Sequence, residues 1–289
     1  MKKLAGVTLM VVGLIIFLST LGSCFSTSSS GEKLEEVRID LQETHHLLLE
    51  STSIDIRIEK AEGNELIVEV EEKQRNQDLI FDERGDRITV KMVEGNRFSI
   101  PFFKPRPETE MIVFIPEQHL DELEIKTVSG DVSSHTRLLV GDLHFRTTSG
   151  DIEATEINAS QAILSSTSGN VVVDSFMGGQ AAAKTVSGDI EIGGIDGDID
   201  LDTVSGDILV TYTDSNQDAH LKTVSGDIEV LVQDLNATLD LKTTSGDIEI
   251  DEMLTEQRFQ SRRVTGTAGN GDYMISSVTT SGDMSILKK

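Results

Sequence analysis

The chain has 289 residues, of which 50 are acidic and 25 basic, so its formal net charge is −25. Such an excess of acid disfavours nucleic acid as a partner, because phosphate contacts need a basic face. The chain has one cysteine, which excludes an internal disulfide, and its 4% aromatic content favours stacked aliphatic side chains over a thick globular core.

Residues 1–25 have the layout of an export signal or a membrane anchor. Two lysines precede an apolar run over residues 4–18, and residues 21–24 (Leu-Gly-Ser-Cys) resemble a bacterial lipobox, which makes Cys24 a candidate for lipidation. The alternative is an uncleaved transmembrane helix of about 22 residues. Both predict anchoring to the cell membrane with the rest of the chain on the extracytoplasmic side. The Ser-rich residues 26–34 are expected to be a flexible tether.

Residues 35–120 are less regular than the C-terminal half of the chain. Alternating stretches at residues 54–59, 66–71 and 86–92 predict strands, as does the apolar run at 111–116. We expect irregular N-terminal coils here that cap the open end of the array, since an uncovered strand edge invites aggregation.

Residues 97–107 stand out because they hold three prolines, three phenylalanines and three basic residues in an acidic chain. Aromatic and basic side chains together suit a membrane interface or a partner. The alternative is a segment that plugs the end of the fold. The residues of this candidate interaction loop are Phe98, Phe102, Phe103, Lys104 and Arg106.

From residue 121 to 289 a Ser-Gly-Asp triplet recurs, with successive glycines 18 to 20 residues apart. A fixed period of this size predicts one structural unit stacked on copies of itself, a β-solenoid. Weaker copies stand at 270–272 and 281–283. The turn residues of the regular copies are Gly130, Asp131, Gly150, Asp151, Gly169, Asn170, Gly188, Asp189, Gly206, Asp207, Gly226, Asp227, Gly246 and Asp247.

Each repeat reads as a strand, a tight turn and a second strand. Apolar residues at every second position, such as Leu221, Ile228 and Val230, predict one buried face. The glycine is expected to supply a positive φ, and the Asp carboxylate to accept a hydrogen bond within its own turn. The predicted fold class is all-β: a single-stranded, parallel β-helix-like solenoid of about 20 residues per coil after the apolar anchor. The usual hand of β–β crossovers predicts that it is right-handed.

The repeated Thr-Val-Ser-Gly-Asp-Ile unit and the lead-in around residues 115–127 resemble the bacterial "putative adhesin" β-strand-repeat family, a domain of unknown function. The resemblance covers roughly residues 35–287. A short anchor followed by this domain is similar to LiaG-like proteins of the Gram-positive cell envelope. The resemblance implies an extracytoplasmic β-solenoid without assigned catalytic residues, and a fold by itself supplies no ligand.

The aspartates of the turns raise the question of a cation. Like charges stacked one strand apart repel each other, and Ca²⁺ prefers carboxylates. The nearest approach to a calcium-repeat loop is formed by Asp196, Asp198 and Asp200, although the period and the number of ligands per turn differ from such loops. No other cofactor is expected.

The alternative to Ca²⁺ binding is that the aspartates only stabilise their turns. Near the turns stand a basic column before them (Lys126, Arg146, Lys184, Lys222 and Lys242) and an acidic column after them (Glu153, Glu191, Glu229 and Glu249). On neighbouring strands these two ladders are expected to offset one another.

No residue set breaks the repeat to build a catalytic site, and the six histidines lack paired metal-ligand spacing. We therefore expect a non-enzymatic, membrane-tethered protein with a binding or structural, adhesin-like role at the bacterial cell envelope. Its expected partners are a cell-wall polymer or a membrane protein. The alternatives are an accessory component or sensor in envelope-stress signalling and, less favoured, a glycan-active enzyme.

Overall fold

The computed structural model describes residues 35–40, 45–73, 77–94, 109–116, 120–260 and 262–289. All of them belong to one compact unit, Lys33–Lys289. These residues form strands and turns only, which confirms the all-β prediction. Within them, no helix has the length and apolar character needed to cross a bilayer.

The strands fall into three groups along the chain. The N-terminal group is β1 (Glu35–Asp40), β2 (His46–Glu50), β3 (Asp55–Lys60), β4 (Glu65–Glu71), β5 (Gln77–Arg84), β6 (Arg87–Glu94) and β7 (Glu110–Ile115). The middle group is β8 (Leu120–Lys126), β9 (Val132–Arg146), β10 (Ile152–Ser165), β11 (Val171–Lys184), β12 (Ile190–Asp202), β13 (Ile208–Tyr212), β14 (Ala219–Lys222) and β15 (Ile228–Val232). The C-terminal group is β16 (Ala237–Lys242), β17 (Ile248–Ile250), β18 (Thr255–Gln260), β19 (Arg263–Thr267), β20 (Tyr273–Val278) and β21 (Met284–Lys288).

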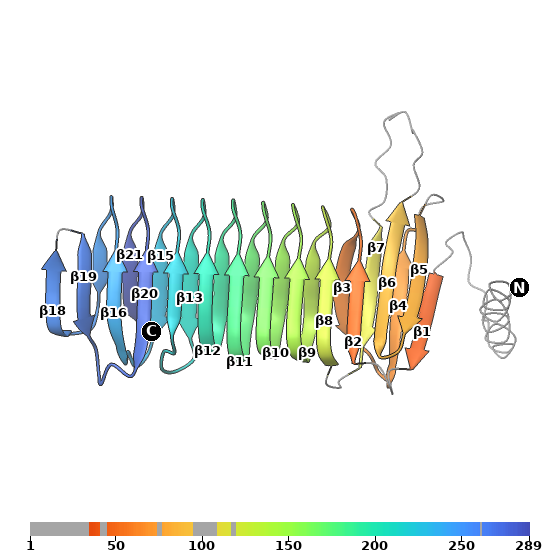
Figure 1. The fold of residues 1–289 in the computed structure, drawn as a ribbon, viewed down its shortest axis with the longest axis horizontal. Helices are drawn as coiled ribbons and strands as arrows, with labels where there is room; N and C mark the ends of the chain where they lie inside the picture. Colours follow the sequence, from red (N-terminus) through yellow and green to blue (C-terminus); the bar gives the residue numbers. More distant parts are fainter. Residues whose placement is uncertain (1–34, 41–44, 74–76, 95–108, 117–119, 261) are drawn as a thin grey trace, which may run out of the picture. The chain divides into compact units, whose positions relative to one another are not determined.

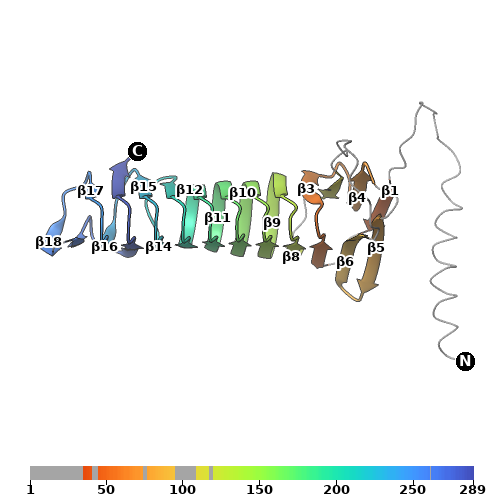
Figure 2. The ribbon, with the colours of Figure 1, turned by 90° about the horizontal axis from the view of Figure 1, so that it is seen from above.

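Each coil has two faces joined by the Ser-Gly-Asp turn (Figures 1 and 2). In the coils, strands that run into the turn lie on face 1 and strands that leave it lie on face 2. With the end strands included, the order on face 1 is β5-β6-β2-β8-β9-β10-β11-β12-β14-β20-β16-β19-β18. The order on face 2 is β1-β4-β7-β3-β9-β10-β11-β12-β13-β15-β21-β17. The long strands β9 to β12 bend and contribute one end to each face.

The core is a set of aliphatic columns between the two faces. The position after the repeat Asp is one such column, paired residue by residue from coil to coil: Ile56, Val132, Ile152, Val171, Ile190, Ile208, Ile228, Met284 and Ile248. All but Ile248 are at most 2% exposed. Burial of each such side chain stabilises the fold by about 1.5–3 kcal/mol, so stacked aliphatic side chains supply most of a core in which Phe145, Phe176 and Tyr212 are also buried.

The stacking order departs from the chain order at both ends. At the N-terminal end, the coil made by β2 and β3 pairs with β8 and β9 on one side and with β6 and β7 on the other, although β4 to β7 come between β3 and β8 in the chain. At the C-terminal end, β20 and β21 lie between β14–β15 and β16–β17. The weaker copy at 281–283 is therefore a full internal coil of the array.

Antiparallel strands close the array at each end. Strands β4 and β1 extend face 2 beyond β7, and β5 extends face 1 beyond β6. At the other end, β19 and β18 extend face 1 beyond β16. The end strands thus differ in direction from the parallel strands that they border.

Candidate binding surface

The repeated turns form one continuous edge of the molecule, which we call the turn edge (residues 127–131 and their equivalents in the other coils). Its buried base is a column of hydroxyls. The Thr147 Oγ1 accepts from the Gly150 backbone N–H at 3.0 Å and donates to the Gly130 carbonyl of the preceding coil at 3.2 Å. Most other coils repeat the second bond, with Ser166, Thr185, Thr203, Thr223, Thr279 and Thr243 as donors.

The repeat aspartates bond the next coil, and not their own turn as the sequence suggested. The Asp131 carboxylate accepts the backbone N–H of Asp151 at 2.8 Å, and the Asp189 carboxylate accepts that of Asp207 at 2.8 Å. Asn170 takes the same place with its side-chain oxygen, which accepts the Asp189 N–H at 2.9 Å. In every coil but the last, that of Asp247, the side chain of this Asp column therefore joins two coils, and the polarised N–H offsets repulsion between neighbouring carboxylates.

The repeat glycines also have a different role from the one expected. Of those in the regular copies, only Gly246 has a positive φ, at 158°, which is close to extended backbone. What they share is a close approach: a Cβ on Gly150 would lie 2.0 Å from the Gly130 carbonyl oxygen, and one on Gly188 would lie 2.1 Å from that of Gly169. Glycine is required because successive turns stack backbone on backbone.

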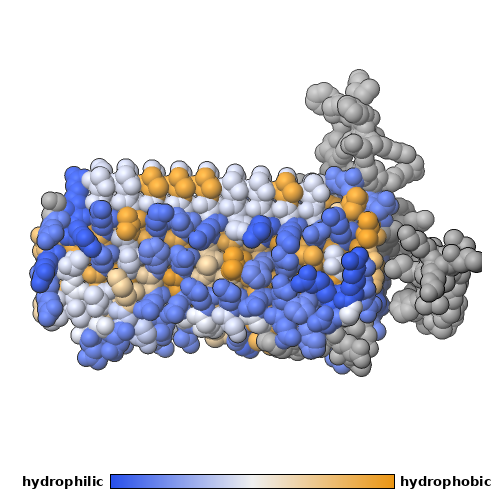
Figure 3. Space-filling view, in the orientation of Figure 1, coloured by the Kyte–Doolittle hydropathy of each residue, from blue (hydrophilic) through white to orange (hydrophobic). Residues whose placement is uncertain are grey.

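At the crest of the edge runs a column of Thr and Val, which we call the tip column. In spatial order it contains Thr52, Val128, Thr148, Thr167, Val186, Val204, Val224, Thr280 and Thr244. The four valines are 40–48% exposed. Figure 3 shows this row along the upper border of the molecule, above a face covered with hydrophilic side chains. Adjacent tips are about 4.8 Å apart, so the crest offers a β-branched side chain, Thr or Val, at every strand spacing.

The charged columns flank this crest on opposite sides. The basic column lies on face 1, where it precedes the turn, whereas the acidic column lies on face 2. Within the described residues, the ion pairs of the basic column stay on face 1: Lys126 pairs with Glu124 at 2.6 Å, and Lys222 with Asp202 at 3.4 Å. The expectation that the two ladders offset one another is therefore wrong, because the turn separates them.

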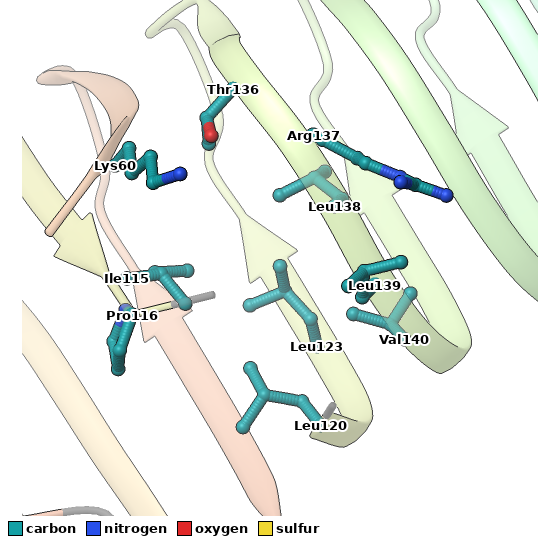
Figure 4. A pocket seen from close by; sticks show the side chains of 10 residues that line it. All are labelled: Lys60, Ile115, Pro116, Leu120, Leu123, Thr136, Arg137, Leu138, Leu139 and Val140. Carbon is teal, nitrogen blue, oxygen red and sulfur yellow. The ribbon is translucent and has the colours of Figure 1, made fainter. Parts of the chain in front are cut away.

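The cavity shown in Figure 4 is very small. Side chains of β7, β8 and β9, among them Ile115, Leu123 and Leu138, surround a cavity of about 10 Å³. That volume is at the lower limit for a single water molecule. A more open hollow of about 430 Å³ lies at the C-terminal end and is lined by Lys242, Thr243, Thr244, Gln260, Arg262 and Arg263.

The aspartates proposed for Ca²⁺ do not converge. Asp196, Asp198 and Asp200 occupy alternate outward positions of β12, and Asp198 accepts the backbone N–H of Asp218 at 3.2 Å. Nowhere in the described ranges do three His, Cys, Asp or Glu side chains come together in a way that could hold a metal ion. The calcium hypothesis has no support from this geometry. Cys24 and the candidate loop at Phe98, Phe102, Phe103, Lys104 and Arg106 lie outside the described residues.

Two features were missed in the sequence: the tip column and a charged cluster at the first coil. In the cluster, His46 Nδ1 lies 2.9 Å from Glu122 Oε2, to which Arg87 also donates at 3.1 Å. Burial acts to raise the pKa of Glu122, but the bond with His46 and the charge of Arg87 hold it below its usual value. The cluster joins β2 to β6 and β8, which are distant in sequence, so no local pattern indicates it.

Comparison with solved structures finds three to which this chain is similar. A "putative lipid binding protein" from Parabacteroides distasonis is 18% identical, with a TM-score of 0.51 over 88% of this chain and 96% of that one. "Putative adhesins" from Bacteroides fragilis (13% identical; 89% of this chain and 98% of that one) and P. distasonis (14% identical; 88% and 97%) have TM-scores of 0.49 and 0.42. At such identities the first likeness shows the fold alone.

A search of curated proteins found no match. A family model does match: that of the Toastrack domain DUF4097 covers residues 44–287. This span contains every coil of the solenoid, including the inserted one at β20–β21. The chain belongs to the Toastrack DUF4097 family.

Proposed function

We propose that this chain is a non-enzymatic, adhesin-like protein of the bacterial cell envelope, which binds a regular polymer of the cell wall along its turn edge. Membership of a β-strand-repeat family of unknown function is compatible with this role. The N-terminal residues 1–25 would hold the chain at the membrane, through lipidated Cys24 or as a helix, with the solenoid on the extracytoplasmic side.

The observation that carries the proposal is the periodicity of the edge. Every coil presents an exposed Thr or Val tip, then a serine, then a carboxylate or amide of the Asp column. A row of similar groups at one strand spacing can contact a polymer at many comparable points, so weak contacts add along its length. The described residues bring together no nucleophile, base and oxyanion donors around a cavity, which is what an enzyme of glycans needs.

The test uses the full chain in a neutral detergent and isolated wall fragments. We expect the protein to sediment with the fragments. A triple variant, Val186→Asp with Val204→Asp and Val224→Asp, should lose most of that binding, because it fills the tip column with charge. The control is Ile80→Asp, which changes an exposed side chain on β5, away from the turn edge. Equal binding by the triple variant and the wild type would contradict the proposal.

The alternatives predict other outcomes of the same preparation. If the protein does not bind wall fragments but co-purifies with one membrane protein, the sensor role in envelope-stress signalling is favoured. Binding to vesicles without any wall material would favour a lipid ligand. Cleavage of wall glycans would establish an enzyme. The anchor is tested by mass spectrometry, in which Cys24→Ser should abolish a diacylglyceryl modification.

A further inference from the structure

The C-terminal end of the solenoid has the shape of a step. The last coil shared by both faces contains β16 on face 1 and β17 on face 2. Face 1 then continues with β19 and β18. On face 2, β17 pairs only with β21 and is the last described strand of the stack. Face 1 therefore extends beyond face 2 by two strands, β19 and β18.

Apolar side chains lie open at this step. Ile248 and Ile250 on β17 are half-buried, whereas their counterparts one repeat earlier, Ile228 and Val230, are 2% and 1% exposed. Phe259 on β18 pairs in register with the buried Val264, so it points to the interior side of face 1. It is nevertheless 70% exposed, because no strand of face 2 lies opposite. The core is thus incomplete at this end.

The outward side chains nearest the two edges of the step differ in charge, although β18 also carries the exposed Glu256. On the overhang, Arg258 lies on the outer side of β18, opposite Thr265 of β19, and Arg263 lies on the same side two residues before Thr265. Arg263 is neutralised by Asp240, with bonds of 2.6 and 2.7 Å, but Arg258 has no ion pair among the described residues. The end of face 2 carries Glu249, the outward residue of β17, with Asp247, Asp251 and Glu252 around it.

A second copy of this chain fits the step when the two-fold axis runs parallel to the strands. That axis places face 1 of one copy in line with face 2 of the other, so each overhang occupies the place where its partner lacks two strands. Strand β18 runs with β16 and opposite to β17, and the axis preserves strand direction. It therefore meets β17 of the second copy antiparallel, with Arg258 and Glu249 both on the outer side.

The other two-fold arrangement is worse. An axis perpendicular to the faces joins β18 to β18, so face 2 is missing over both overhangs and Phe259 stays exposed. It also brings the Arg258 side chains of both copies to the same edge, where like charges repel. Completion of the core and the sign of the charges both select the first arrangement.

We propose that the chain forms a two-fold symmetric dimer through its C-terminal step, with each β18–β19 overhang completing the partner's core. The interface is isologous and closes after two copies, so it does not lead to filaments. The axis keeps both turn edges on the same side, and the dimer therefore presents one edge of twice the length. This inference goes beyond the proposed function and holds whatever the edge binds.

The test measures the mass of the full chain in neutral detergent by sedimentation velocity over a hundredfold range of concentration. We expect a dimer whose dissociation constant rises at least tenfold in Arg258→Glu and in Glu249→Arg. The double variant Arg258→Glu with Glu249→Arg restores opposite charge across the interface and should regain most of the affinity. Arg84→Ala, an exposed cation on β5 paired with Asp82, is the control and should change nothing.

A second variant is independent of charge. In a Cys24→Ser background, Glu249→Cys with Arg258→Cys should give a disulfide-linked dimer under mild oxidation, since edge-paired residues fall within the roughly 4.4–6.8 Å that a disulfide spans. The two single-cysteine variants should not link. A monomer at all concentrations, or a dimer that is indifferent to the charge swaps and gives no cross-link, would overturn the proposal.

Discussion

Three small residues of the turn, Thr, Gly and Asp, allow each coil to bond the next. The Thr hydroxyl bonds a glycine carbonyl, the glycine leaves room for that carbonyl, and the Asp carboxylate binds an N–H of the neighbouring coil. The sequence indicates their importance through repetition. It does not indicate the reason, because all three contacts join residues about 20 positions apart.

The role of the glycines predicts that an alanine at one of these positions destabilises the fold. Gly188→Ala places a Cβ 2.1 Å from the Gly169 carbonyl oxygen, so the coils must separate locally. We expect a loss of unfolding free energy of about 1–3 kcal/mol or more, as overpacking costs elsewhere. The matched control is Gly63→Ala, where no atom lies within 4 Å of the new Cβ. Equal urea midpoints for the two variants would contradict the stacking role.

The natural Asn170 in the Asp column predicts that asparagine can replace another aspartate of the column. Asp189→Asn keeps the side-chain oxygen that accepts the Asp207 N–H, as Asn170 does for Asp189, and it removes one of several stacked charges. We expect stability equal to the wild type or slightly above it. Asp189→Ala loses the bond and should cost about 1 kcal/mol. Thermal unfolding at neutral pH checks both, and a larger loss in the Asn variant than in the Ala variant would exclude this role.

Tyr212 gives a pH dependence. It is fully buried, and burial together with the charge of Asp198 raises the pKa of its phenol above the usual range. Above pH 10, about where an unfolded tyrosine ionises, the unfolded chain releases a proton that the folded chain retains. Stability should therefore fall by up to about 1.4 kcal/mol per pH unit above that point. Tyr212→Phe should reduce this slope between pH 10 and 11, and an unchanged slope would show that Tyr212 is not its source.

At the scale of elements, the strand–turn–strand unit and its period of about 20 residues follow from the sequence, because alternation and turn residues are local signals. The position of a coil in the stack is not local. Because the coils have nearly the same sequence, any one of them could pack against any other. Nothing in the sequence of residues 281–283 therefore shows that they lie between the turns at 226 and 246. The end strand β4 alternates as strictly as the coils do, so the pattern indicates a strand but not its antiparallel pairing.

The inserted coil predicts a large effect of truncation. Deletion of residues 273–289 removes Ile275, Met284 and Ile286 from the core and leaves β14–β15 without their neighbours. Lost burial of about 5 kcal/mol should lower the melting temperature by about 10 °C or more. Removal of Lys289 alone is the control and should have little effect. A truncated chain as stable as the wild type would mean that the last coil is not internal.

At the scale of the whole molecule, the fold is a linear array in which each coil contacts only its neighbours. Its stability is then a sum of nearest-neighbour terms, and its net charge of −25 acts against compaction along the entire length. The family and the fold class follow from the repeat. A ligand does not, since the edge uses the same residues that hold the coils together.

Self-repulsion predicts that salt stabilises the protein. Raising the ionic strength from 0.01 to 0.15 M shortens the Debye length from about 30 to 8 Å, which screens charges several coils apart. The melting temperature should rise by a few degrees with either NaCl or KCl. If only Ca²⁺ raised it, at concentrations too low to screen, a specific cation site would have to be present.

The order of the coils is tested most directly by two cysteine pairs in a Cys24→Ser background. Ser225 and Ser281 lie on adjacent coils, whereas Ser225 and Ser245 are separated by the inserted one. Their spacing is then about 9.6 Å, beyond the roughly 7 Å that a disulfide allows. We predict that Ser225→Cys with Ser281→Cys forms an intramolecular disulfide and that Ser225→Cys with Ser245→Cys does not. The opposite result would show coils stacked in chain order and contradict this structure.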